Sequence, residues 1–141
     1  MSGDLMKIVF SDKKNGRTAQ LEVAKDREPM LIGKKIGEMI EGAVVGLDGF
    51  KLQITGLSDS MGAPSRKEIE GSRKAYALLS HGPGIIGAKK GMRVRKLVRG
   101  NVVSADTSQI NTVITEYGTK SAEELFPKKA AAKEQTAAEA K

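Results

Sequence analysis

Alternating apolar and polar residues mark two strands near the start of the chain. Residues 6–10 carry Met, Ile and Phe at every second position, and residues 17–23 carry Ala, Leu and Val in the same way. Such period-two alternation is typical of a strand with one buried face. The dipeptide Asn15-Gly16 between them favours a tight turn. We therefore predict a β-hairpin over residues 6–23.

Shorter apolar runs farther along the chain have the same character. They predict strands at 50–55, 74–79, 94–103 and 110–115, separated by loops rich in glycine. Residues 30–49 are less regular: their isoleucines have helical spacing, but three glycines would each cost about 1 kcal/mol in a helix interior. We predict short extended pieces and turns there. The predicted fold is mainly β, with a small antiparallel, barrel-like body.

The end of the chain has a different composition. Ser121 and Glu124 form a capping-box pattern, which predicts a short C-terminal helix before Pro127. Residues 128–141 contain alanine, lysine and glutamate but no large apolar residue, so they cannot bury a face. We expect a folded domain over residues 1–127, followed by a disordered tail over residues 128–141.

The net charge of +7 is concentrated in one segment of the chain. Residues 1–60 hold nine basic and nine acidic side chains, and residues 101–141 hold five basic and six acidic ones. Residues 61–100 hold ten basic side chains and two acidic ones. A polyanion such as nucleic acid is the natural partner of this segment. The alternative is a solvated basic face that only aids solubility.

The basic segment suggests how such a partner would be bound. In a strand over residues 93–99, Arg93, Arg95 and Arg99 would share one face and span roughly 20 Å, which suits a phosphate backbone. An edge strand protected by charge is the other interpretation. Tyr76 is the only aromatic residue in the segment, so recognition of phosphates and shape in structured RNA is favoured over base-by-base reading. The predicted RNA-binding residues are Arg66, Lys67, Arg73, Lys74, Lys89, Lys90, Arg93, Arg95, Lys96 and Arg99.

The inventory of reactive side chains argues against an enzyme. Cysteine is absent and His81 is the only histidine, so Cys-ligated and multi-histidine metal centres are excluded. The loop Gly82–Gly87 lacks the Gly-Lys-Ser/Thr ending of a phosphate-binding loop. Asp59 and Asp106 lie among turn formers, which favours capping or turn roles. We predict no catalytic residue, cofactor, metal or small-molecule substrate, and no apolar run is long enough for a membrane helix.

Several ordered motifs together resemble the ribosomal protein S6e family of the small subunit, in its short archaeal form. They are the loop over residues 54–64 with Asp59, Gly62 and Pro64, then Leu78-Leu79-Ser80, Arg93 to Gly100, Gln109-Ile110-Asn111 and Ser121 to Pro127. The chain departs from the family pattern at residues 57, 65, 85, 86, 92 and 94.

The resemblance implies a mainly β structural protein of the small ribosomal subunit, located in the cytoplasm, with an S6e-type RNA-binding domain over residues 1–127. Its partners would be 16S ribosomal RNA and neighbouring small-subunit proteins, and its role would be to support translation. The charge distribution leads to RNA binding by itself, whereas the ribosome follows only from the resemblance. A free-standing regulatory module that binds structured RNA is the alternative.

Overall fold

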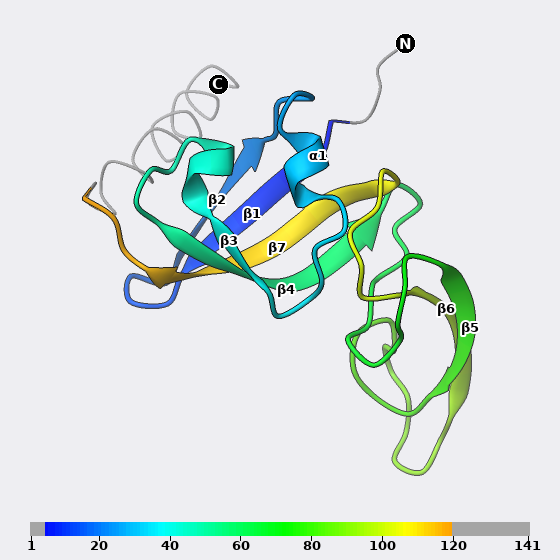
Figure 1. Ribbon diagram of the computed structural model, residues 1–141. Helices are drawn as coiled ribbons and strands as arrows, with labels where there is room; N and C mark the ends of the chain where they lie inside the picture. The colour runs from blue at the N-terminus through cyan, green and yellow to red at the C-terminus, as the bar shows by residue number, and fades with distance from the viewer. Residues whose placement is uncertain (1–4, 120–141) are drawn as a thin grey trace, which may run out of the picture.

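Residues 5–119 are described by the computed structural model, and they form two sheets joined at one end (Figure 1). The larger sheet has five strands and the smaller one has two. The strands are β1 (Lys7–Asp12), β2 (Arg17–Glu22), β3 (Met39–Glu41), β4 (Lys51–Asp59), β5 (Lys74–Leu79), β6 (Val94–Arg99) and β7 (Thr107–Glu116). The helices are the single turn α1 (Glu28–Leu31) and the 3-10 turn η1 (Gly42–Val45).

The larger sheet has the strand order β2-β1-β7-β4-β3. β1 and β2 form the antiparallel hairpin predicted from residues 6–23, which is therefore confirmed. β7 lies at the centre, parallel to β1 and antiparallel to β4. The sheet is thus mixed and stays open between β2 and β3, so within residues 5–119 the expectation of an antiparallel, barrel-like body is wrong, while that of a mainly β fold is confirmed.

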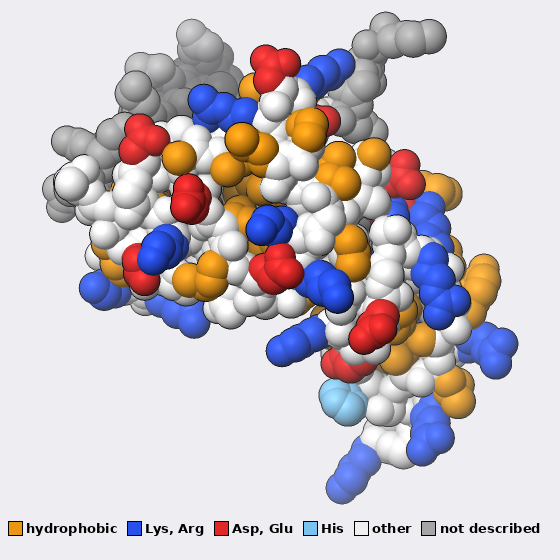
Figure 2. Space-filling model, in the orientation of Figure 1, with side chains coloured by type: hydrophobic (Ala, Val, Ile, Leu, Met, Phe, Trp, Pro, Cys, Tyr) orange, Lys and Arg blue, Asp and Glu red, His pale blue; other side chains and the backbone are white. Residues whose placement is uncertain are grey.

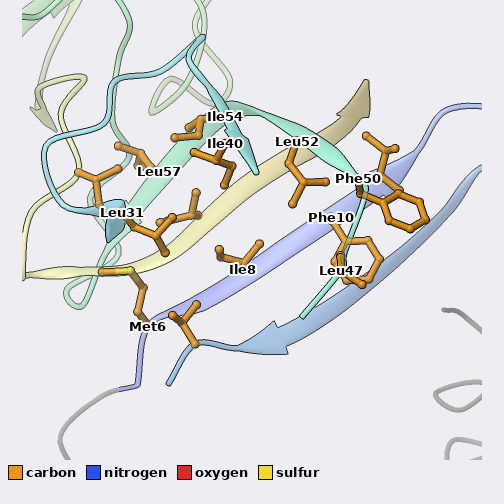
Figure 3. Close-up of a cluster of buried hydrophobic side chains, with 14 of the residues drawn as sticks. Met6, Ile8, Phe10, Leu31, Ile40, Leu47, Phe50, Leu52, Ile54 and Leu57 are labelled. Carbon is orange, nitrogen blue, oxygen red and sulfur yellow. The ribbon is translucent and has the colours of Figure 1, made fainter. Parts of the chain in front are cut away.

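One face of this sheet carries the hydrophobic core (Figure 3). The inward positions of the strands supply Ile8, Phe10, Leu52 and Ile54, all at most 2% exposed. The same alternation that predicts these strands also selects the residues that are buried. The core is closed by side chains of the connection between β2 and β4, namely Leu31, Ile40, Leu47 and Phe50.

That connection contains the residues whose sequence pattern is irregular. Short extended pieces and turns were predicted for 30–49, and the structure has the strand β3 and several turns there, together with α1 and η1. Gly42 occupies a point where two backbone segments of this connection meet closely. Its Cα lies so close to the backbone oxygens of Leu47 and Phe50 that a Cβ would collide with them.

The smaller sheet is the antiparallel hairpin of β5 and β6, beyond the ends of β4 and β7 in Figure 1. The predicted strand at 74–79 is confirmed, and the strand predicted at 94–103 ends at Arg99. The loop over residues 80–93 connects β5 to β6 and contains the glycine-rich stretch Gly82–Gly87. The predicted C-terminal helix and tail lie outside the described residues.

Candidate nucleic-acid interface

Eight of the ten predicted RNA-binding residues are exposed, and Figure 2 shows Lys and Arg side chains projecting from several sides of the part that holds β5 and β6. Within residues 5–119, Lys74 is the only one of the eight that forms an ion pair. The other seven have no acidic partner there and are available to an external anion. These seven, called the free basic set below, are Lys67, Arg73, Lys89, Lys90, Arg93, Arg95 and Lys96.

The strand register places the basic residues of β6 on both faces of the hairpin. Arg95 lies opposite Leu78, whereas Lys96 lies opposite Ala77, and successive residues of a strand point to opposite faces. The predicted row of three arginines on one exposed face is therefore incomplete. Arg93 precedes the strand and is exposed, but Arg99 is only 4% exposed.

Arg99 is buried because it pairs with a buried carboxylate. Its Nη1 lies 3.0 Å from Oδ1 of Asp59, and Nζ of Lys74 lies 2.8 Å from Oδ2 of the same residue. Both contacts are therefore ion pairs between the carboxylate and a cation. Nη2 of Arg99 donates to the carbonyl of Ser72 and to Oγ of Ser104, each at 2.7 Å. These groups satisfy the guanidinium inside the protein.

We call Asp59, Lys74 and Arg99 the ion cluster. Asp59 is the last residue of β4, Lys74 the first of β5 and Arg99 the last of β6. Asp59 comes from the larger sheet, while the two cations come from the hairpin. The cluster therefore fixes the basic hairpin to the core of the protein by charge.

The position of Asp59 in the alternating pattern of β4 indicates this cluster, although the predicted turn role of Asp59 does not depend on that position. Leu57 and Asp59 are two residues apart near the end of β4, and both face inward with 4% and 3% exposure. An inward carboxylate needs a cation, because burying an unpaired charge is costly. The predicted turn role of Asp59 is also present, since the backbone N–H of Ser60 donates to Oδ1 at 2.7 Å.

The environment of Asp59 predicts how stability depends on pH. Burial raises the pKa of this carboxyl. Lys74, the Ser60 N–H and Arg99 lower it, and together they outweigh burial, so the pKa lies below its ordinary value. The Asp12 pKa is also lowered, mainly by the hydrogen bond from the Tyr117 hydroxyl. A carboxyl whose pKa is lower in the folded state stabilises the fold above its unfolded pKa and loses this contribution in acid.

We therefore expect the free energy of unfolding to be flat near neutral pH and to fall below about pH 4. Urea unfolding over a pH series measures it. In acid, the Asp59→Asn variant should bind fewer protons on unfolding than the wild type, by up to one. Its free energy of unfolding should therefore fall less steeply as the pH decreases. Asp26→Asn is the control for the loss of one acidic charge, because Asp26 is exposed and has no ion pair in the described part of the chain, and its profile should match the wild type. An Asp59→Asn profile as steep as that of the wild type would contradict the assignment.

Arg66 is the second predicted contact that the fold buries, at 8% exposure. Its Nη1 donates to the carbonyls of His81 at 3.0 Å and Pro83 at 3.1 Å, and its Nε lies 3.3 Å from Glu68. The backbone carbonyls of the loop after β5 therefore accept hydrogen bonds from an arginine of the protein rather than from a ligand. Arg66 holds the loop that carries Lys89 and Lys90.

Gly100 lies where the chain leaves the ion cluster. A Cβ at this position would overlap the carbonyl oxygen of Gly71, so the backbones of two segments meet here. Glycine at this position is therefore required by a close approach of two backbone segments. The approach is to the protein itself, and it fixes the segment before β5 against the end of β6.

Metal sites and membrane-spanning helices were also considered for the described part of the chain. Residues 5–119 contain no group of three side chains that could hold a metal ion. Among the same residues, no helix has the length and apolar character needed to cross a membrane. The free basic set is thus the main chemical feature of the described surface.

Comparisons with known proteins agree on one family. The family model described as ribosomal protein S6e matches residues 6–127. The small ribosomal subunit protein eS6 of Methanocaldococcus jannaschii is 51% identical over 120 residues, which cover 85% of this chain and 89% of the relative. The protein of the same name from Methanosphaerula palustris is 42% identical over 128 residues, which cover 91% of this chain and 97% of the relative. The chain belongs to the ribosomal protein S6e family.

Proposed function

We propose that this protein is a structural constituent of the small ribosomal subunit and binds 16S ribosomal RNA through the free basic set. The observation that supports this most directly is seven exposed cations without an acidic partner in the described part of the chain. Phosphates are the groups that such cations bind best in RNA. Its relatives bear the name of a small-subunit protein, which supports a cytoplasmic role in translation beside other ribosomal proteins.

The proposed contact set differs from the one expected from the sequence. Arg66 and Arg99 are assigned to the fold, because both are buried and have partners within the protein. Lys74 lies at the boundary, since its side chain is 36% exposed but is paired with Asp59. The hairpin and its loop supply most of the remaining cations, on both faces. This arrangement suits insertion between RNA backbones better than a single flat contact.

Salt dependence is the experiment that tests phosphate binding. If five or six phosphates are neutralised, log affinity for 16S ribosomal RNA should fall with log salt at a slope of about −4. Filter binding or anisotropy at several potassium concentrations measures the slope. A slope shallower than about −2 would mean that the basic set is mainly solvated and would contradict the proposal. Co-sedimentation with small subunits through a salt wash separates a ribosomal protein from a free-standing RNA-binding module.

A further inference from the structure

The basic hairpin also bears an apolar strip on one face. Tyr76 is 70% exposed, Leu78 57% and Leu97 38%. Tyr76 lies opposite Leu97 in the strand register, and Leu78 lies opposite Arg95, so these four side chains share one face. Within residues 5–119 the ring of Tyr76 stacks on no other aromatic ring. Because most of this ring is exposed to solvent, packing within the hairpin does not account for an aromatic residue at this position.

Charge restricts what could cover this strip. The segment from residue 71 to residue 100 contains no acidic side chain, and Arg95 flanks Leu78 on the same face. A partner must therefore combine a flat apolar surface with negative charge. An unpaired nucleotide has both, because its base presents a π-face while its phosphate carries the charge.

We propose that Tyr76 stacks on an unpaired base of RNA, with Leu97 beside it and Arg95 at an adjacent phosphate. This inference rests on the proposed function and adds a preference that phosphate contacts alone do not give. A base within an A-form helix is already stacked on its neighbours, and the deep major groove excludes side chains. The hairpin should therefore prefer RNA in which a base is bulged or looped out of the helix.

Two RNA hairpins of equal length test the preference, one fully paired and one with a single bulged nucleotide. Anisotropy titrations give the affinity of each for the full chain. We expect the wild type to prefer the bulged RNA by roughly 5- to 150-fold, the range that stacking of one base contributes. Tyr76→Ala should abolish the preference and leave the affinity for the paired hairpin unchanged. Tyr76→Phe should keep the preference, because the ring is retained.

Tyrosine fluorescence gives an independent measurement. The chain has two tyrosines and no tryptophan, so Tyr117→Phe leaves Tyr76 as the only emitter. Bulged RNA should quench this emission, whereas paired RNA should quench it much less. Tyr76→Leu separates stacking from simple apolar contact, because leucine is apolar without a π-face. This variant should lose the preference as Tyr76→Ala does.

The outcomes separate this inference from the proposed function. If the wild type binds both hairpins equally and Tyr76 is not quenched, base stacking is overturned, and the strip is left to a protein partner. If Tyr76→Leu keeps the full preference, the contact is apolar rather than stacked, and the inference is equally overturned. In both cases the salt dependence of binding is unchanged. Failure of the proposed function would instead appear as a shallow salt slope for both RNAs.

Discussion

Replacing Asp59 with asparagine is expected to lower the free energy of unfolding by about 3 kcal/mol. The substitution keeps the shape of the side chain but removes its charge. Lys74 can turn to solvent because its side chain is 36% exposed, whereas that of Arg99 is 5% exposed and cannot. The buried guanidinium would then keep only the exposed carboxylate of Asp106, whose Oδ2 lies 3.9 Å from its Nη2, as a counter-charge. Losing the buried partner of an ion pair is strongly destabilising. Urea unfolding at neutral pH measures the change.

A surface ion pair of similar length provides the matched control. Lys51 and Glu116 lie 2.9 Å apart, but both side chains are more than half exposed. Glu116→Gln should leave the urea midpoint nearly unchanged, because exposed pairs contribute little. The double variant Asp59→Leu/Arg99→Met should be more stable than Asp59→Asn, since it leaves no buried unpaired charge. Equal stabilities of Asp59→Asn and Glu116→Gln would disprove the importance of burial.

Removing the charge of the β5–β6 loop and β6 is expected to have the largest effect on RNA binding. The variant changes Lys89, Lys90, Arg93 and Arg95 together to glutamine. All four are exposed and have no acidic partner in the described part of the chain, so the fold should be unaffected. The magnitude of the salt slope should fall by about 3, and affinity at low salt by on the order of 100-fold. Anisotropy with 16S ribosomal RNA measures both.

A variant with the same net charge shows whether position matters. Lys7, Lys13, Arg17 and Lys25 are also exposed, but they belong to the larger sheet and its connections. Changing these four to glutamine lowers the charge equally. We expect a loss of affinity that is several times smaller, since only long-range attraction is reduced. Equal losses in the two variants would mean that net charge alone, and not the hairpin surface, governs binding.

Local patterns in the sequence predict most of the strands. The alternation of apolar residues in 6–10 and 17–23, with Asn15-Gly16 between them, is sufficient for the β1–β2 hairpin. It also predicts the inward positions of Ile8 and Phe10. These features depend on neighbours within a few residues, and such neighbours are visible in the sequence.

The order of the strands in the sheet cannot be predicted from these local patterns. β1 pairs with β7 in parallel, about one hundred residues away along the chain, and alternation carries no information about which strand is adjacent. A mixed, open sheet and a closed antiparallel one have the same inward and outward residues on each strand. The predicted barrel was wrong for this reason.

The predicted site was limited by the same lack of long-range information. Arg99 and Arg95 have identical chemistry, and their four-residue spacing puts them on one side of the strand. Only the position of Asp59, forty residues earlier, decides that Arg99 is internal. Arg66 is similar, because its partners are backbone carbonyls of a loop. Positive charge in a sequence therefore predicts which segment binds RNA, whereas burial in the structure decides which of its basic residues are exposed.

The expectation of a non-enzymatic protein is confirmed by the family. Its relatives are structural ribosomal proteins, and the loop Gly82–Gly87, considered as a possible nucleotide site, is held through its backbone by Arg66. A glycine-rich loop next to lysines is easily mistaken for a phosphate-binding loop of an enzyme. Here the neighbouring lysines belong to the proposed RNA surface.

The central place of β7 has a consequence for synthesis of the chain. β7 is the last strand of the described residues, and it is the only strand that connects the β1–β2 hairpin to β3 and β4. The core therefore cannot close until residues 107–116 have left the ribosomal exit tunnel. The β5–β6 hairpin depends on nearer contacts and can form earlier. A nascent chain of this protein thus exposes its basic hairpin before its hydrophobic core exists, which makes prompt completion of translation a protection against aggregation.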